Sequence, residues 1–249
     1  MTLPLLRGWS AVYWRELLIL RRRLSRMAAS MAVSPLLYVV AFGWAFGDRH
    51  MPDGRTYLEF LIPGLAAMAS MTQAWSMASE INISRFYWHI FEEFQAAPVS
   101  HMGYVLGEVL GGVTRTLLAV AVICGIGFAF GVPLRLGPLF WLAAALNGWV
   151  FASLAVASAM LVRTHADQAL ATSFIITPMG FLGGTFFPLE RLPDWARSAV
   201  QLLPVTHAAG AMRPASYGLT PPLFSYLLLA GLGLACFLFA ARCVDRARD

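Results

Sequence analysis

The sequence contains no lysine, and all 18 of its basic residues are arginine. A phosphate-binding P-loop needs a lysine after its glycines to reach the terminal phosphates of a nucleotide. A Schiff-base enzyme likewise needs a lysine amine to form its covalent intermediate. The missing lysine therefore excludes both kinds of site, including ATP hydrolysis by a P-loop within this chain.

Charged residues of any kind are scarce, at 12% of 249 residues, while 59% of the residues are hydrophobic. A soluble domain has about 25% charged residues. No polar segment is long enough to build a second core, so we expect one membrane domain over residues 1–249. Cysteine is also rare: Cys124, Cys236 and Cys243 lie in or beside apolar runs, and we expect no disulfide.

Groups that could carry bond chemistry are few. No two of the five histidines have metal-ligand spacing on one helix, and neither a G-x-S-x-G motif nor a glycosidase-like pair of acids occurs. We expect no catalytic residue and no metal site. A Ser/His/Asp cluster formed by folding stays open, so a membrane enzyme acting on lipids or glycolipids is one alternative. A nucleotide-independent channel or scaffold is another.

Six apolar stretches have the length of a membrane-spanning helix. They cover residues 28–46, 57–79, 102–130, 136–162, 168–187 and 223–241. Backbone groups in hydrocarbon must be hydrogen-bonded within their own segment, so each stretch is predicted to be helical. The predicted fold class is all-α, with six transmembrane helices.

The arginines divide unevenly between the two sides of these six spans. With the N-terminus inside, the inner segments hold Arg7, Arg15, Arg21, Arg22, Arg23, Arg26, Arg85, Arg163, Arg242, Arg246 and Arg248. The outer segments hold Arg49, Arg55, Arg135, Arg191, Arg197 and Arg213, and Arg115 lies within a span. Since positive charge concentrates on the cytoplasmic side, both termini are predicted to lie inside.

The segment 8–27, before the first span, has a helical repeat of apolar residues. The apolar positions are Trp9, Tyr13, Leu17, Leu20, Leu24 and Met27, with arginines over much of the remaining surface. This pattern predicts an amphipathic helix in the inner membrane interface.

Between the second and third spans, residues 84–98 form a segment that is too short and too charged to span. As one helix it would place Arg85, His89, Glu92 and Glu93 on one side, and Tyr87, Ile90, Phe91 and Phe94 on the other. An aromatic face of this kind must be covered. Two interpretations stay open: it packs on its own membrane helices, or it docks into a partner protein.

Residues 188–222, between the fifth and sixth spans, are too long for a simple turn. We expect one short helix over 195–203, capped by Asp194 and ended by Pro204, and a second over 207–213. Neither could cross a bilayer, so both are predicted to be re-entrant on the outer side.

Two ionisable residues, Glu108 and Arg115, lie seven positions apart in the third span and share a helix face. Gly111 and Gly112, between them, permit close helix contact. Either each charge pairs with a neighbouring helix, or the two form a hinge or coupling element. Glu80, at the end of the second span, is interpreted as a terminus whose side chain extends to the surface.

Large apolar residues in the spans include Phe42, Trp75, Phe174 and Phe181. Most such residues face lipid or pack between helices. Together they also suit a hydrophobic substrate, so these four are the candidate substrate path.

The outer segment FFPLERLPDWARSAVQLLPVTHAAGAMR resembles the signature of the type-2 export class of ABC transporter permeases. The stretches DQALATSFIITPMGFLGGTFFP, SPLLYVVAFGWAFG and YLEFLIPGLAAMASM are similar to the same family, so the resemblance covers most of the chain. Among its branches the chain looks most similar to permeases that export nodulation factors, which are lipo-oligosaccharides. The chain is also similar to permeases of this class that export drugs and lipids.

The resemblance implies a homodimer that works with two copies of an ABC ATPase in the bacterial inner membrane. ATP and magnesium would bind to the ATPase, with no cofactor on this chain and no nucleic acid. Residues 84–98 would be the coupling helix. The outer helices would gate the exit, with Phe187, Trp195 and His207 as candidate gate residues. The substrate would be amphiphilic, lipid-linked or lipo-oligosaccharide-like, or a hydrophobic drug.

Overall fold

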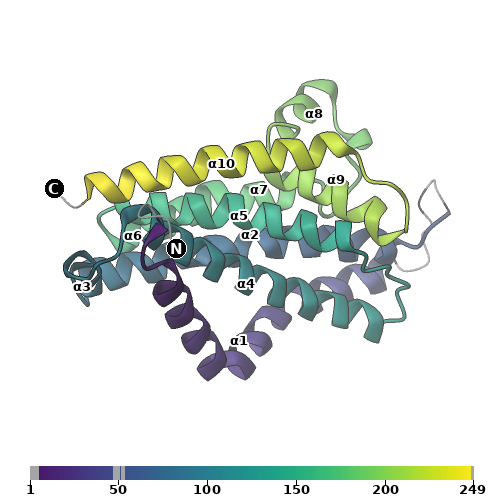
Figure 1. Cartoon of the computed structure of the whole chain (residues 1–249). Helices are drawn as coiled ribbons and strands as arrows, with labels where there is room; N and C mark the ends of the chain where they lie inside the picture. Colours follow the sequence, from purple (N-terminus) through teal and green to yellow (C-terminus); the bar gives the residue numbers. More distant parts are fainter. Residues whose placement is uncertain (1–5, 47–50, 52–53, 248–249) are drawn as a thin grey trace.

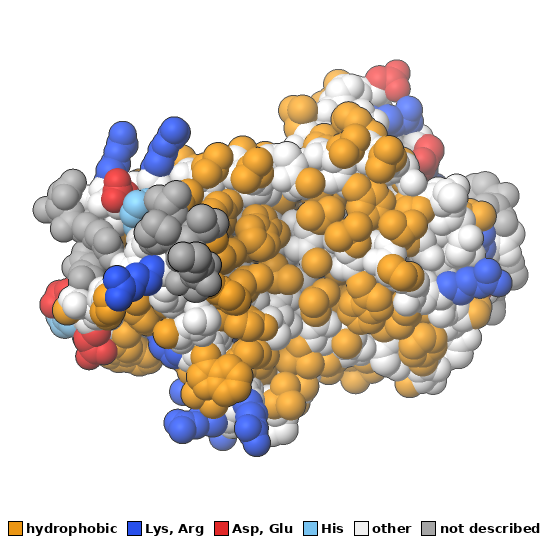
Figure 2. Space-filling view, viewed as in Figure 1, with side chains coloured by type: hydrophobic (Ala, Val, Ile, Leu, Met, Phe, Trp, Pro, Cys, Tyr) orange, Lys and Arg blue, Asp and Glu red, His pale blue; other side chains and the backbone are white. Residues whose placement is uncertain are grey.

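The computed structural model describes residues 6–46, 51 and 54–247, and every regular element in that part of the chain is helical. The long helices α2 (Tyr57–Phe86), α4 (His101–Ala129), α5 (Pro138–Leu161) and α10 (Leu223–Arg246) run side by side along one axis (Figure 1). Hydrophobic side chains cover the middle of the face in Figure 2, and charged ones gather near the ends. The all-α prediction is confirmed.

Four helices are long and apolar enough to cross a membrane: α1 (Trp9–Phe46), α4, α5 and α10. Central helix α2 is also long, but it carries charged residues including Glu59, Glu80 and Arg85. The remaining predicted span contains a π-helical turn between two short α-helical parts. The chain is therefore a multi-pass membrane protein, and the count of six crossings stays a prediction.

Helix α1 joins two elements that the sequence predicted as separate, the interface helix 8–27 and the span 28–46. Figure 1 shows this helix bent into two arms, and arginine side chains gather at the bend in Figure 2. The first arm packs on α4 through Val12 and Glu16, neither of which belongs to the predicted apolar stripe. Tyr13 of the stripe also contacts α4, with its hydroxyl 3.1 Å from that of Thr114.

The predicted fifth span is a continuous helix made of α6 (His165–Ala171), a π-helical turn (Thr172–Ile176) and α7 (Thr177–Leu182). Pro178 has no N–H to donate to the fourth preceding carbonyl, which favours a local change of hydrogen bonding. The prediction that the helix continues to residue 187 is wrong. It stops at Leu182, and Gly184 adopts a φ of +77°, which favours glycine.

The predicted single helix over 84–98 is divided. Helix α2 continues to Phe86, and α3 (Ile90–Ala96) follows after a turn. His89, in that turn, has a φ of 54°, a left-handed conformation that a helix cannot contain. The face shared by Arg85 and Glu92 in a continuous helix therefore does not form.

The outer segment contains a short 3₁₀ turn (Leu189–Arg191), α8 (Asp194–Val200) and α9 (Pro204–Ser216). The two expected helices exist, with different bounds. Asp194 is the first residue of α8, and its expected role as the N-cap is wrong. Pro204 begins α9, because the first turn of a helix needs no N–H from its first residue.

Helix α9 is fastened to α2 at the point where α2 contains a proline. Pro63 cannot donate to the carbonyl of Glu59, and the Tyr217 hydroxyl donates to that carbonyl at 3.2 Å. Arg213 donates to the carbonyl of Phe60 at 3.2 Å and to that of Gly184 at 2.6 Å. Side chains from α9 and its C-terminal turn thus hydrogen-bond backbone carbonyls beside Pro63 in α2 and just after the end of α7.

The two ends of the bundle hold different elements. We call the end that holds α3 and the last turns of α2, α5 and α10 the charged end. The opposite end holds α8, α9 and the first turns of α2 and α5 (Figure 1).

Candidate coupling site and its charge cluster

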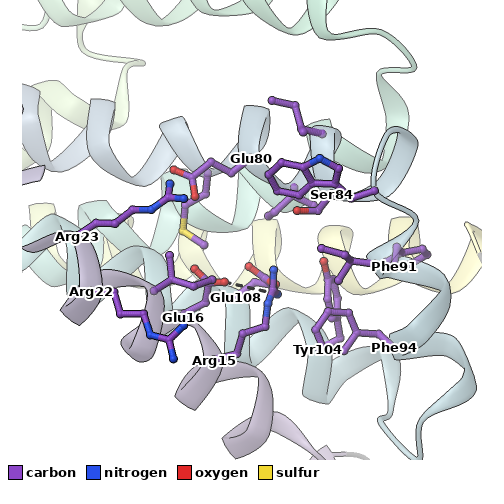
Figure 3. A pocket seen from close by; sticks show the side chains of 16 residues that line it. Arg15, Glu16, Arg22, Arg23, Glu80, Ser84, Phe91, Phe94, Tyr104 and Glu108 are labelled. Carbon is purple, nitrogen blue, oxygen red and sulfur yellow. Dashed lines mark hydrogen bonds and ion pairs between the residues drawn. The ribbon is translucent and has the colours of Figure 1, made fainter. Parts of the chain in front are cut away.

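A cavity of about 420 Å³ lies at the charged end, between the first arm of α1, the last turns of α2, α3 and the first turns of α4. Its walls combine charged and aromatic side chains (Figure 3). The charged members are Arg15, Glu16, Arg22, Arg23, Glu80 and Glu108, and the aromatic members are Trp88, Phe91, Phe94 and Tyr104. The candidate site is this cavity and the ion pairs behind it.

Arg115 is the centre of these ion pairs. Its guanidinium lies 2.8 Å from Glu16 Oε2 of α1 and 2.7 Å from Glu80 Oε1 of α2. The side chains of Arg115 and Glu16 are almost fully buried, whereas that of Glu80 is 54% exposed. Glu80 therefore extends to the surface, as the sequence indicated, and it is also an ion-pair partner of Arg115. One arginine links three helices.

Glu108, two turns earlier on α4, pairs with a different arginine. Arg15 Nη1 lies 3.4 Å from Glu108 Oε1 and 3.5 Å from Glu16 Oε1. Glu108 and Arg115 thus each pair with charges from neighbouring helices, as in the first interpretation of the sequence. We call Arg15, Glu16, Glu80, Glu108 and Arg115 the charge cluster.

A row of glycines allows α1 to approach α4 closely enough to form this cluster. Gly103, Gly107 and Gly111 recur every four residues on one face of α4. A Cβ at Gly107 would lie 2.5 Å from Cβ of Val12, and one at Gly111 would lie 2.9 Å from Cβ of Glu16. A Cβ at Gly103 would meet the carbonyl oxygen of Arg7. Only glycine fits these positions without displacement.

Gly112 has different neighbours from Gly111. A Cβ there would lie 2.7 Å from Ala152 of α5 and 2.8 Å from Met77 of α2. The adjacent glycines thus let α4 pack closely against α1 on one side and against α2 and α5 on the other.

Helix α3 contacts the charge cluster through its aromatic residues. The rings of Phe91 and Phe94 lie 5.5 and 5.2 Å from that of Tyr104 on α4. The Arg15 guanidinium lies over the Phe94 ring at 5.2 Å. Phe91 is buried at 6% exposure, so this face packs on its own chain, the first of the two interpretations for 84–98.

Other predicted coupling residues lie on the surface. Tyr87 is 65% exposed, and Glu93 is exposed. His89 Nδ1 lies 2.9 Å from Glu92 Oε1, with both side chains about two-thirds exposed. Arg85 is directed elsewhere: it donates to the carbonyl of Met160 on α5 at 2.8 Å. The surface available to another protein is therefore the polar side of α3 and the turn before it.

Glu16 was missed by the sequence analysis, although the sequence contains a signal for it. It is the only acidic residue among the first 47 residues, in a segment rich in arginine. A lone acid on a basic amphipathic helix has no reason to face anionic headgroups, so it indicates a buried basic partner. Arg115 itself, 99 positions away, could not be identified as that partner from one sequence.

Comparison with known proteins identifies the family. The model of the family described as "ABC-2 type transporter" matches residues 7–217. The chain belongs to the ABC-2 type transporter family.

Curated ABC-2 relatives cover most of this chain at modest identity. It is 28% identical over 223 residues to the inner membrane transport permease YadH of Escherichia coli K12, covering 87% of this chain and 86% of that protein. It is 29% identical over 223 residues to nodulation protein J of Bradyrhizobium diazoefficiens, covering 83% and 80%.

A third relative is the daunorubicin resistance ABC transporter permease protein DrrB1 of Streptomyces coeruleorubidus. It is 26% identical over 197 residues, covering 76% of this chain and 68% of that protein. The resemblance to ABC-2 permeases stated from the sequence is confirmed. ABC-2 permeases are transport subunits that work with ABC ATPases.

The candidate substrate-path residues do not converge on one place in this ABC-2 chain. Phe42 and Phe181 both contact the ring of Phe186, at 5.3 and 5.0 Å. Trp75 is buried, and its indole N–H donates to the hydroxyl of Thr172 at 2.8 Å. Phe174, in the π-helical turn, is 76% exposed.

The candidate gate residues are also separate from one another. Phe187 is partly buried against the core, and Trp195 is 78% exposed. The His207 ring lies 2.8 Å from the carbonyl oxygen of Gln201 through Nε2 and 5.8 Å from the ring of Phe224. Within the described residues, no group of three or more His, Cys, Asp or Glu side chains could hold a metal ion.

Proposed function

We propose that this chain is the membrane permease subunit of an ATP-driven exporter in the bacterial inner membrane. Two copies of the chain and two copies of an ABC ATPase form the working unit, and ATP and magnesium bind to the ATPase. Six segments cross the bilayer: the second arm of α1, α2, α4, α5, the helix α6–α7 with its π-helical turn, and α10. Membership of the ABC-2 family supports this assignment.

The charged end faces the cytoplasm in this proposal, and both termini lie on that side. Arg85, Arg242 and Arg246 lie at the last turns of α2 and α10, and Arg163 follows the end of α5. The first arm of α1 adds further arginines. An excess of arginine in short loops and helix ends is typical of the cytoplasmic side.

One observation carries the coupling role of α3: this helix is exposed on its polar side and packed against the charge cluster on its aromatic side. A partner that displaces α3 would move Phe91 and Phe94 against Tyr104 and Arg15. Arg15 pairs with Glu108, and Glu16 and Glu80 share Arg115. A movement of α3 therefore acts on α1, α2 and α4 together.

In the proposed cycle, nucleotide binding closes the two ATPases and shifts α3. The charge cluster then rearranges, and the membrane helices switch between two states with different affinity for the substrate. A charged cluster suits this role because its pairs can exchange partners, whereas a closely packed apolar contact resists displacement.

The proposed substrate is an amphiphile, such as a lipid-linked compound, a lipo-oligosaccharide or a hydrophobic drug. The names of relatives support this range, since one is a daunorubicin resistance permease and others are nodulation proteins. A groove of about 240 Å³ between α1 and α2 also mixes polar and apolar walls, including Ser34, Tyr38, Met68 and Gln73.

The test uses the permease purified with a co-expressed ABC ATPase and reconstituted in vesicles. The double variant Glu92→Arg/Glu93→Arg reverses two exposed charges on α3. We expect the ATPase to be lost during purification, or ATP hydrolysis to become independent of a transported amphiphile. Phe91 is a poor choice for this test because its substitution would disturb packing within the chain.

The matched control is Glu190→Arg/Asp194→Arg, which makes the same charge change on exposed residues at the opposite end. We expect this variant to keep its ATPase and its substrate-stimulated hydrolysis. A fully coupled Glu92→Arg/Glu93→Arg complex would contradict the docking role of α3. Transport or substrate turnover by vesicles that hold this chain alone would instead favour a channel or a membrane enzyme.

A further inference from the structure

A second cavity at the charged end, of about 530 Å³, is separate from the candidate coupling site. It lies between the last turns of α2, α5 and α10 and the residues that follow α5. Its charged wall residues are Arg85, Arg163, Arg242 and Arg246. In the part of the chain that the structure describes, no acidic residue lines it. The coupling site, in contrast, balances its arginines with three glutamates.

These arginines are held near one another by the fold. Arg242 and Arg246 are one helical turn apart on α10 and therefore lie on the same face of that helix. Arg85 is fixed by its hydrogen bond to Met160 and lies over the ring of Phe86 at 4.9 Å. Within the described ranges, none of the four arginines forms an ion pair with a carboxylate. Four cations that converge without acids attract an anion.

The remaining walls of this cavity are apolar, and part of them faces outward from the bundle. Leu161 is 61% exposed and Phe239 is 48% exposed, and both belong to helices that can cross the membrane. An anion that binds here would therefore have hydrocarbon surface beside its charged group. Free phosphate offers no such surface, but a phospholipid does.

We propose that this cavity binds the headgroup of an anionic phospholipid from the surrounding bilayer. The guanidinium groups of Arg163, Arg242 and Arg246 hold the phosphate oxygens, for which their planar donors are well suited. The first carbons of the acyl chains lie against Leu161 and Phe239. With four arginines available, a lipid with two phosphates (cardiolipin) binds more tightly than one with a single phosphate (phosphatidylglycerol).

The experiment measures cardiolipin binding to the purified full-length chain in detergent, by native mass spectrometry and by the rise of Tm. We expect saturable binding of cardiolipin, weaker binding of phosphatidylglycerol and no binding of phosphatidylcholine. The variant Arg242→Gln/Arg246→Gln should bind cardiolipin on the order of 30-fold more weakly. Both residues are exposed, so the variant is expected to fold.

The matched control is Arg21→Gln/Arg26→Gln, which removes two exposed arginines from α1 outside this cavity. It should bind cardiolipin as the unchanged chain does. Equal loss in both variants would overturn the proposal, because it would indicate general attraction to a basic surface. An equal rise of Tm with inorganic phosphate would overturn the lipid assignment. So would a variant that keeps its cardiolipin but loses a co-purified ATPase, since the cavity would then serve a protein partner.

Discussion

Each end of the bundle contains an arginine that joins several elements, and the two arginines have different partners. At the charged end, Arg115 pairs with the carboxylates of Glu16 and Glu80. At the opposite end, Arg213 pairs with the backbone carbonyls of Phe60 and Gly184. The charge cluster holds several carboxylates close together, so its ion pairs can exchange when the helices shift, whereas each carbonyl at the opposite end is fixed in its backbone. We infer that the charged end is built to rearrange and the opposite end to hold its irregular backbone in place.

The largest expected effect comes from removing Arg115. The variant Arg115→Met removes the closest cation from buried Glu16 and leaves it only the longer contact with Arg15 at 3.5 Å, and we expect a loss of about 3–5 kcal/mol in the free energy of unfolding. Unfolding in detergent with increasing denaturant measures it. Adding Glu16→Gln should recover most of the loss, because the buried charge that lost its closest partner is then gone. An Arg115→Met chain as stable as the unchanged one would show that the cluster contributes nothing.

At the opposite end, Arg213→Met should cost about 2–3 kcal/mol, because two carbonyls lose a charged donor. The same unfolding measurement applies. The control is Arg197→Met, whose guanidinium also donates to backbone carbonyls, those of Leu189, Glu190 and Leu192, but from a more exposed site. We expect a cost below about 1 kcal/mol for the control. Equal costs for the two variants would show that the buried carbonyls gain no more from their arginine donor than the more exposed ones do.

A smaller effect is expected from Gly107→Ala, at about 1–2 kcal/mol, since the new methyl group meets Val12. Gly125→Ala in the same helix is the control, because a Cβ there has no neighbour within 4 Å. Alanine is the better helix former, so the control should be unchanged or up to about 1 kcal/mol more stable. If both alanines act alike, the contact between α1 and α4 is not close.

The smallest effect on stability is expected from Glu92→Arg/Glu93→Arg, within about 0.5 kcal/mol, because both side chains are exposed. The variant should change only the binding of the partner ATPase or the coupling of its ATP hydrolysis to the substrate. A large loss of stability in the permease alone would mean that α3 supports the bundle and would weaken its assignment as a docking element.

The apolar helices were predictable because their length and composition are set by the bilayer. The points at which these helices bend or end were harder to predict. The apolar stripe over residues 8–27 runs directly into the apolar stretch 28–46, so the sequence could not show whether one helix or two would form. The break before α3 depends on His89 in a left-handed conformation, which is uncommon outside glycine and leaves no signal in the sequence.

The candidate site was predicted in part. Glu108 and Arg115 were visible as charges inside an apolar span, but their partners come from helices that are distant in sequence. The inward face of α3 was identified by its aromatic residues, yet which of the two possible surfaces covers it depends on Tyr104, an ordinary aromatic residue in α4. Contacts of this kind follow from tertiary packing and are not encoded locally.

The glycine row on α4 affects the register in which α1 packs along it. Gly103, Gly107 and Gly111 repeat every four residues, and so do Val12, Glu16 and Leu20 on the facing helix. Moving α1 along α4 by one turn, about 5.4 Å, would bring a similar set of small and large groups into contact. Apolar packing alone therefore leaves several nearly equivalent registers. Glu16 reaches Arg115, and Arg15 reaches Glu108, in only one of these registers, so these two ion pairs select it.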